Sequence, residues 1–314
     1  MQPLCRSRTT RLSGPRRYAG AVNGYVPHGA TATDGIALEV TPERAGWGFS
    51  GLRVVELAAG GSALLDSGLD ELIVLPLAGG GAVRIDGVEF SLDGREDVFS
   101  AVSDFVYVPR GARIELSSLR GGRFALPSAR ASRDLEPRHV AAADVPVELR
   151  GAGQASRQVN NFCSPEAFAA DRLIAVEVLT PAGNWSSYPP HKHDEDLPGV
   201  EVPLEEIYYF EVRAGPDGPG FGFQRVYGSG RSREIDVCVE VHTGDLVLMP
   251  YGYHGPSMAA PGYDLYYLNV MAGPSARLWQ FRDDPRHAWI RATWDGHAID
   301  PRLPMTSAPR AQPS

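Results

Sequence analysis

Short hydrophobic runs separated by turn-forming residues recur along almost the whole chain. The 314 residues include 35 glycines and 26 prolines, so few stretches sustain the 3.6-residue repeat of an amphipathic helix. Segments rich in β-branched and aromatic residues predict two series of strands: 52–57, 71–77, 82–85, 104–108 and 113–116, then 174–179, 207–212, 222–226, 237–241, 246–249 and 266–271. Many short strands at this spacing indicate an all-β fold of the sandwich or barrel type.

Helical signals are few. Ser164 and Pro165 precede a short Ala/Phe run, which predicts a short helix over 164–170 with Ser164 as N-cap. A second short helix is expected near 284–291. The polar, Arg/Ala/Pro-rich stretch 126–157 has weaker patterning and is the expected connection between two β domains.

The charge distribution limits the classes of partner. The formal net charge is −8, but residues 1–33 contain five arginines and no acid, which leaves 25 basic against 38 acidic residues, a net charge of −13, in the rest. A body this acidic is a poor binder of nucleic acid. No apolar run approaches the length of a bilayer span, so no membrane partner is expected. The basic leader resembles a transit peptide, although a disordered tail or translation from an upstream start is the favoured interpretation.

The cysteines indicate the compartment. Cys5, Cys163 and Cys238 are far apart and form no CxxC pair, which excludes a zinc ribbon and argues against a disulfide framework. A reducing, cytoplasmic setting is therefore expected.

A metal site is the strongest chemical prediction. His191 and His193 are two residues apart, so on a strand both imidazoles face the same side. Glu206 begins the aromatic strand 206–210, and His254 follows a Pro-x-Gly turn. Three imidazoles and a carboxylate suit a divalent metal, with Zn²⁺ favoured and Mn²⁺, Fe²⁺ or Ni²⁺ as alternatives.

The residues between these ligands need a separate interpretation. The acidic insert 194–205 contains five carboxylates that could compete as ligands, but Glu205 would point to the face opposite Glu206. The insert is expected to be either a solvated loop or a lid over the site. Lys192, the only lysine among 30 basic residues, would face away from the metal. It is expected behind the metal-binding residues, pairing with Asp194, Glu195 or Asp196.

The two strand series end in similar turns. Both contain an apolar strand, then Pro-x-Gly, then one residue and a polar side chain, which is Arg113 in the first copy and His254 in the second. This indicates a duplication in which only the second copy kept a side chain that can bind a metal.

The motif order resembles that of the cupin barrel, in which HxH and Glu come from the first motif and the last His from the second. Several further segments resemble one family, the 5-deoxy-glucuronate isomerases of myo-inositol catabolism, relatives of the uronate ketol-isomerases. These segments are 46–57, 150–153, 156–160, 188–194, 205–210, 222–227 and 266–273. The resemblance extends from Tyr25 to Asp295. It implies a bicupin that interconverts 5-deoxy-glucuronate and 2-deoxy-5-keto-gluconate.

The resemblance also implies a domain plan. Residues 1–24 would form a disordered basic leader, 25–145 a degenerate N-terminal cupin barrel with its linker, 146–300 the metal-binding barrel and 301–314 a disordered tail. The metal positions implied are His191, His193, Glu206 and His254.

Aldose–ketose isomerisation requires an electrophile at the carbonyl oxygen and a base beside it. The sequence does not identify the base, for which Tyr208, Tyr253, Tyr267 and Glu240 are candidates. A carboxylate on the substrate favours an arginine fork. The expected substrate-binding residues are Arg225, Arg157 and Gln224. Lys192 is expected farther from the substrate, in a supporting position.

Other functions use the same ligands. A cupin dioxygenase or decarboxylase with Fe or Mn, another uronate ketol-isomerase, and a non-catalytic sugar-binding cupin all remain open. The expected partner is a small uronate-type sugar acid, and the sequence leaves open whether the chain forms a homo-oligomer.

Overall fold

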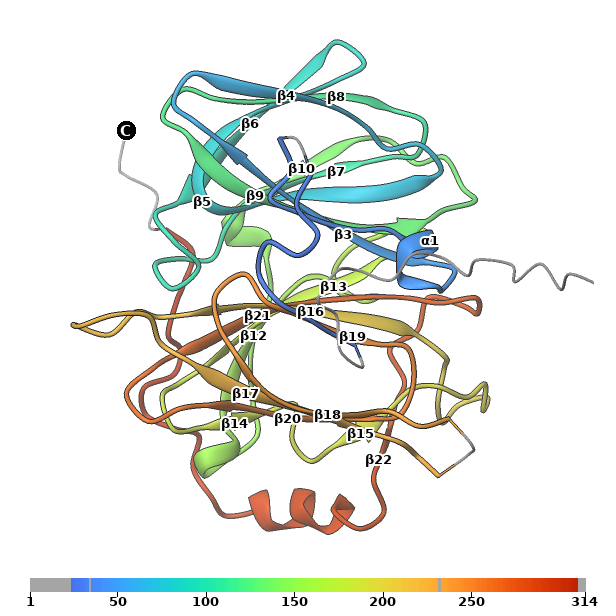
Figure 1. Cartoon of the computed structure of the whole chain (residues 1–314), viewed down its shortest axis with the longest axis vertical. Coiled ribbons are helices and arrows are strands. Elements are labelled where there is room, and N and C mark those ends of the chain that lie inside the picture. The colour runs from blue at the N-terminus through green and yellow to red at the C-terminus, as the bar shows by residue number, and fades with distance from the viewer. Residues whose placement is uncertain (1–23, 34, 231–232, 310–314) are drawn as a thin grey trace, which may run out of the picture.

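The computed structural model describes residues 24–33, 35–230 and 233–309, and β-strands dominate these ranges (Figure 1). The expected all-β class is confirmed. Helical structure in these ranges is limited to one α-helical turn and three 3₁₀ segments: α1 (Pro42–Ala45), η1 (Ala142–Asp144), η2 (Gly153–Ala155) and η3 (Ala288–Trp294). None of the described helices is long and apolar enough to cross a membrane.

The N-terminal half forms one nine-stranded sheet. Its central strand β5 pairs with four others, β6, β7, β8 and β9. The nine strands are β2 (Leu38–Val40), β3 (Ser50–Leu57), β4 (Gly61–Asp66), β5 (Asp70–Ile85), β6 (Val88–Arg95), β7 (Phe105–Val108), β8 (Arg113–Ser118), β9 (Gly122–Arg130) and β10 (Arg138–Val140).

The C-terminal half contains two sheets. The seven-stranded sheet runs in the order β1 (Tyr25–Val26), β19 (Leu246–Met249), β16 (Glu205–Val212), β21 (Leu265–Ala272), β13 (Ile174–Thr180), β12 (Arg157–Cys163) and β11 (Val147–Arg150). The six-stranded sheet contains β18 (Asp236–Val241), β17 (Gly222–Tyr227), β20 (Tyr253–Ala259), β15 (His191–Lys192), β22 (Arg282–Asp283) and β14 (Trp185–Ser186). All sheet pairings are antiparallel, which permits the short connections predicted from the glycines and prolines.

The two halves share a hydrophobic core. One buried cluster combines Leu52 and Leu75 of the upper half in Figure 1 with Ile207, Tyr209 and Leu268 of the lower half. A second cluster lies inside the C-terminal half and a third inside the N-terminal half. Strand β16 is therefore buried on both faces, which explains its nearly continuous hydrophobic sequence.

Several boundaries differ from the prediction. Residues 165–167 form only a turn, in which Ser164 accepts a hydrogen bond from the Ala167 N–H. The second predicted helix appears as η3, four residues later than expected. The expected connection 126–157 instead holds the end of β9 together with β10 and β11.

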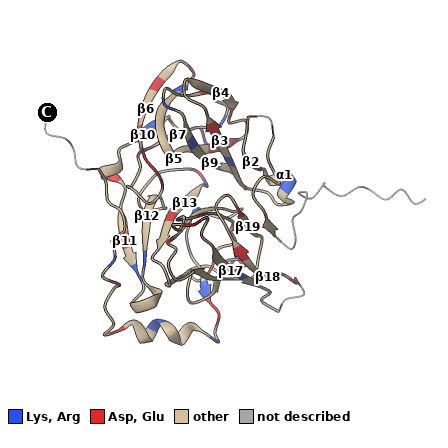
Figure 2. Ribbon diagram, turned by 60° about the vertical axis from the view of Figure 1, so that its left-hand side comes forward, with Lys and Arg blue, Asp and Glu red and all other residues tan. Residues whose placement is uncertain are grey.

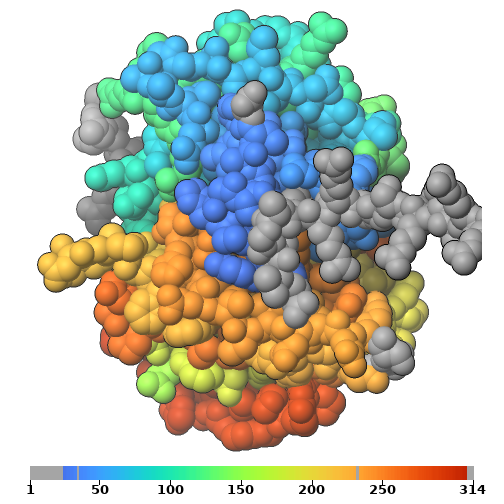
Figure 3. Space-filling model, viewed as in Figure 1, coloured from blue at the N-terminus to red at the C-terminus, as the bar shows by residue number. Residues whose placement is uncertain are grey.

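Both ends of the described chain differ from the expected domain plan. Tyr25 was expected in the N-terminal barrel but pairs with Val247, so β1 joins the C-terminal sheet, and Figure 3 shows the blue N-terminal segment across the boundary between the halves. The prediction of a disordered tail over 301–314 is wrong for 301–309, because Leu303 and Thr306 are buried and Thr306 hydrogen bonds to Gln158. Residues 1–23 and 310–314 lie outside the described residues.

Candidate functional site

The two sheets of the C-terminal half bring the predicted metal-binding residues together. His191 on β15 lies directly opposite His254 on β20 in the six-stranded sheet, and His193 follows β15. Glu206 lies on β16 of the seven-stranded sheet. The turn before His254 needs glycine at position 252, where φ is +89° and a Cβ atom would lie 2.6 Å from the Tyr227 carbonyl oxygen. The Pro-x-Gly sequence thus ends β19 and starts β20 at the position that brings His254 to the site.

Three of the four residues form a tight, buried group. The His193 Nε2 lies 3.0 Å and the His254 Nε2 2.8 Å from the Glu206 Oε2. All three side chains are at most 3% exposed. The buried His254 Nε2 faces the Glu206 carboxylate at ion-pair distance but forms no hydrogen bond of good geometry with the described residues. Two imidazole nitrogens that converge on one carboxylate oxygen in this way fit a metal-binding group.

His191 lies beside this group without joining it. Its ring centroid is 4.4 Å from that of His254 and 6.4 Å from that of His193. Its Nδ1 faces the Pro189 carbonyl oxygen at 3.3 Å, as the His193 Nδ1 faces Leu204 at 3.1 Å. Both contacts direct the Nε2 atoms away from the backbone, an orientation that metal-binding histidines use.

Burial and mutual charge determine protonation in the group. Burial raises the pKa of Glu206, but His254 and His193 outweigh it and hold that pKa below its ordinary value. Burial lowers the pKa of His193, but Glu206 outweighs it and raises that pKa overall. Burial and the neighbouring His254 hold the pKa of His191 well below its ordinary value. The carboxylate is thus ionised, as a ligand must be.

The two adjacent glutamates behave as strand alternation predicts. Glu206 faces the histidines, whereas the Glu205 carboxylate accepts hydrogen bonds from the backbone N–H groups of residues 48, 49 and 50 at 2.7, 2.7 and 3.0 Å. Glu205 therefore joins the two halves of the molecule.

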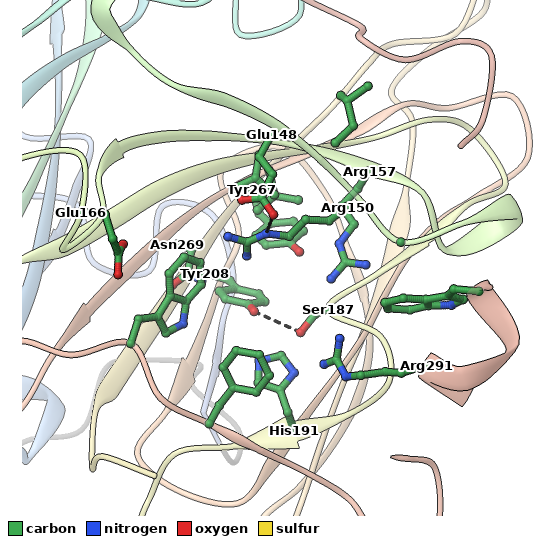
Figure 4. Close-up of a pocket in the computed structure, with 17 residues that line it drawn as sticks. Glu148, Arg150, Arg157, Glu166, Ser187, His191, Tyr208, Tyr267, Asn269 and Arg291 are labelled. Atoms are coloured by element: carbon green, nitrogen blue, oxygen red, sulfur yellow. Dashed lines mark hydrogen bonds and ion pairs between the residues drawn. The ribbon is translucent and has the colours of Figure 1, made fainter. Parts of the chain in front are cut away.

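A cavity of about 640 Å³ opens beside His191 (Figure 4). Its volume is typical of a small-molecule site. It is lined by Glu148, Leu149, Arg150, Gly151, Arg157, Val159, Glu166, Val178, Ser187, His191, Tyr208, Tyr267, Asn269, Trp279, Phe281, Arg291 and Trp294.

Three arginines line this pocket. Arg150 and Arg157 are opposite each other on β11 and β12, and Arg291 comes from η3; Figure 2 shows basic segments on these neighbouring strands and on the helical segment below them. Arg150 pairs with Glu148 and Arg291 with Asp283. Arg157 is buried and has no carboxylate partner among the described residues, and burial lowers its pKa to about 10. The pocket thus contains a buried cation able to receive an anion.

Aromatic side chains form the other walls. Tyr208 and Tyr267 stack with ring centroids 4.4 Å apart, and the Tyr208 hydroxyl lies 3.2 Å from the Ser187 hydroxyl (Figure 4). Burial raises the pKa of Tyr267 to about 12. The Arg157 guanidinium lies 5.8 Å from the Trp294 ring centroid.

The structure does not bring four of the predicted residues to this pocket. Arg225 points away from the buried face of β17 and forms an ion pair with Asp236, whereas Gln224 is buried and accepts a hydrogen bond from Ser257. Glu240 is exposed and pairs with His242. The Tyr253 ring packs on Tyr227, 5.6 Å away.

Arg157, Tyr208 and Tyr267 do line the pocket, as do several residues that the sequence reasoning missed. Among these, Arg150 lies in the segment 150–153, which resembles the family, so the sequence could have indicated it as a substrate-binding candidate. Trp279, Arg291 and Trp294 follow the last long strand, where hydrophobic periodicity gives no signal.

Lys192 is buried and forms the ion pairs predicted with Asp194 and Glu195. Its third partner is Glu201 rather than Asp196.

The chain is similar to known proteins over most of its length. It is 41% identical over 267 residues to the 5-deoxy-glucuronate isomerase of Geobacillus kaustophilus, a match that covers 84% of this chain and 94% of the relative. It is 37% identical over 268 residues to the 5-deoxy-glucuronate isomerase of Bacillus subtilis strain 168, covering 84% of this chain and 96% of the relative.

Solved structures agree with this relationship. The crystal structure of an IolB-like protein from Salmonella typhimurium LT2 matches with a TM-score of 0.79 and 36% identity, covering 86% of this chain and 99% of that protein. The oxalate decarboxylase of Lactobacillus farciminis shares the fold alone, with a TM-score of 0.58 and 13% identity over 83% of this chain and 89% of that one. Residues 25–290 match the KduI/IolB family, and the chain therefore belongs to that family.

Proposed function

We propose that this chain is an aldose–ketose isomerase that converts 5-deoxy-D-glucuronate to 2-deoxy-5-keto-D-gluconate in myo-inositol degradation. Curated relatives that cover most of the chain carry this activity in their names. The observation that carries the proposal is a pocket lined by His191, which lies beside the His/Glu group of His193, Glu206 and His254, and by Arg157, a buried cation with no carboxylate partner among the described residues. A sugar acid with a carbonyl and a carboxylate at opposite ends matches that combination.

His191, His193, Glu206 and His254 would hold a divalent metal, with Zn²⁺ favoured. The convergence of the His193 and His254 Nε2 atoms on the ionised Glu206 carboxylate supports this assignment. When bound, such an ion supplies a Lewis acid that stabilises negative charge on the substrate carbonyl oxygen.

The arginines would bind and orient the sugar acid. Arg157 can offer guanidinium N–H groups to the carboxylate without first breaking an ion pair, whereas Arg150 and Arg291 have carboxylate partners of their own. Trp279, Phe281 and Trp294 would exclude water from the pocket. Of the base candidates, Tyr208 and Tyr267 line the pocket, and we assign the Tyr208 hydroxyl to hydrogen bonding with a substrate oxygen.

We also propose that the two halves are two cupin barrels, within 25–145 and 146–300 except that β1 joins the second, with the metal site in the second barrel alone. The shared fold with a known oxalate decarboxylase supports the cupin assignment. The presence of Arg113 at the first-copy position that corresponds to His254 supports a single site.

The test combines metal analysis with NMR. Purified protein should contain about one divalent metal per chain and convert 5-deoxy-glucuronate to the ketose without oxygen. Removal of the metal by a chelator should abolish the conversion, and adding Zn²⁺ should restore it. Metal-bound protein that leaves this and related uronates unchanged would contradict the isomerase and favour a sugar-binding role. Oxygen consumption or release of CO₂ would instead indicate a dioxygenase or decarboxylase.

A further inference from the structure

Lys192 lies at the centre of a buried group of charges next to the His/Glu group. Its ammonium Nζ lies 2.5 Å from the Asp194 Oδ1, 2.7 Å from the Glu195 Oε2 and 2.7 Å from the Glu201 Oε1. The Lys192 side chain is 2% exposed and the Glu201 side chain 0%. We refer to Lys192, Asp194, Glu195, Glu201 and Arg282 as the Lys192 cluster.

The cluster joins separate segments of the metal-binding region. The Asp194 Oδ2 accepts a hydrogen bond of 2.9 Å from the Gly252 N–H, two residues before His254. The Glu195 carboxylate also pairs with Arg282 at 2.7 Å, and Arg282 lies opposite Lys192 in the pairing of β22 with β15. Ion pairs thus hold the strand that carries His191 to strand β22, and a hydrogen bond joins the same cluster to the turn before His254.

The same cluster closes the acidic insert. Glu201 accepts hydrogen bonds from the backbone N–H groups of Asp194 and Glu195 at 2.8 and 3.1 Å. At the end of the insert, the Leu204 N–H donates to the His193 carbonyl oxygen at 2.9 Å, and the His193 Nδ1 faces the Leu204 carbonyl oxygen. The folded insert therefore fixes the orientation of the His193 ring and the start of β16, where Glu206 lies.

We propose that Lys192 is a positioning residue, and that its cluster sets the separation and orientation of His193, Glu206 and His254 for metal binding. This inference rests on the metal site proposed above. The Lys192 ammonium lies at the centre of three carboxylates. In other proteins a bound metal cation can occupy such a position. The insert is then a clamp behind the ligands rather than a lid over the substrate.

The chemistry of the ammonium group explains why this position is lysine in a chain whose 29 other basic residues are arginine. An ammonium has three N–H donors on a single atom, and each can point to a different carboxylate. A guanidinium is planar and matches one carboxylate in a fork, so it would not reach all three from the same buried volume. The positive and negative charges around Lys192 are also equal in number. Three cations, Lys192, Arg282 and Arg233, pair with three carboxylates, those of Asp194, Glu195 and Glu201.

The test measures Co²⁺ binding to the full chain by chelator competition and by visible absorption, which reports the geometry around the ion. Lys192→Met should weaken Co²⁺ binding about 10- to 100-fold, the usual effect of losing a residue that supports metal ligands. It should also shift the absorption bands. Lys192→Arg should restore neither property fully. Arg95→Met is the matched control, since it removes an equally buried cation from a pair with Glu177 away from this site. It should lower stability and leave both Co²⁺ readouts unchanged.

A milder variant protects the test against misfolding. Glu195→Gln removes one of the three carboxylates at a position that is 11% exposed, and should weaken Co²⁺ binding several-fold. If either Lys192→Met or Glu195→Gln has unchanged Co²⁺ affinity and an unchanged spectrum, the inference about Lys192 is overturned. The proposed metal site is not affected by that result. A wild-type chain that binds no Co²⁺ would overturn the proposed metal site as well.

Discussion

At the scale of single residues, neighbours on one strand have unrelated roles. Glu205 and Glu206 are adjacent on β16, but strand alternation places their side chains on opposite faces of the sheet. Glu206 meets two imidazoles inside the C-terminal half, while Glu205 accepts three backbone N–H groups from the N-terminal half. Because both residues are glutamates, the residue type alone would not show that they have different roles.

The first prediction compares these two glutamates. Glu206→Gln should abolish stoichiometric Zn²⁺ binding, because a neutral amide is a poor ligand beside two imidazoles. Glu205→Gln should retain the metal but lower the free energy of unfolding by about 1–3 kcal/mol, because charged acceptors make the stronger hydrogen bonds. Metal analysis and urea unfolding measure the two effects. Equal metal loss in both variants would contradict the assignment.

Two arginines show the same separation of roles. Arg157 is buried in the pocket without a carboxylate partner among the described residues, whereas Arg225 pairs with Asp236 on the outer face of β17. Both were candidates for substrate binding from the sequence, and only the first reaches the pocket.

The second prediction follows from that difference. Arg157→Ala should raise KM for the uronate by about 10- to 100-fold, the equivalent of ~1.5–3 kcal/mol for hydrogen bonds to a charged group. Arg225→Ala should leave KM unchanged within about two-fold, since a partly exposed ion pair contributes little. Steady-state kinetics with the NMR assay tests both. A large KM increase in Arg225→Ala would favour the original assignment.

At the scale of elements, the segment from Trp279 to Trp294 completes the pocket. Its strand β22 pairs with β15, which carries His191, and η3 follows. Trp294 lies beneath two guanidinium groups, with its ring centroid 5.8 Å from the Cζ of Arg157 and 5.3 Å from that of Arg291. This irregular segment therefore orients the arginines.

The third prediction tests this element with two tryptophans from η3. Trp294→Ala should raise KM by about 2- to 30-fold, because a partly desolvated cation–π contact contributes ~0.5–2 kcal/mol. Trp289 lies in the same helical segment but is 64% exposed and does not line the pocket. Trp289→Ala should therefore have normal kinetics. The prediction fails if the two variants have the same KM.

At the scale of the whole molecule, the two halves form one packed body. Besides their shared hydrophobic cluster, Arg95 of β6 forms a buried ion pair with Glu177 of β13. Glu177 also accepts hydrogen bonds from Tyr266 at 2.9 Å and Asn160 at 3.0 Å. Removing one partner would leave a buried charge without compensation.

The fourth prediction concerns this interface. Arg95→Met should lower the free energy of unfolding by roughly 3–5 kcal/mol, the usual cost of breaking a buried pair from one side. Arg84→Met, which breaks exposed pairs with Glu89 and Glu115, should leave the free energy of unfolding nearly unchanged. The wild type should unfold in one calorimetric transition, because the halves share a core. Two separate transitions would show that the halves unfold independently.

Features that depend on local pattern could be predicted from the amino-acid order. Alternation and turn residues predicted the all-β class and the opposite directions of Glu205 and Glu206, and the motif spacing identified the residues that gather around Glu206. The same alternation predicted that Lys192 faces away from the metal-binding side of its strand, where acids of the insert could pair with it. Short-range geometry decides these features, so a single chain contains the information.

Contacts between distant segments depend on the tertiary fold. The fold brings Arg150, Arg157 and Arg291 to one pocket and leaves Arg225 and Glu240 outside. It also folded the acidic insert around Lys192 and packed residues 301–309 against the body. These outcomes depend on how sheets and irregular segments pack across long sequence separations, and no local periodicity encodes that packing.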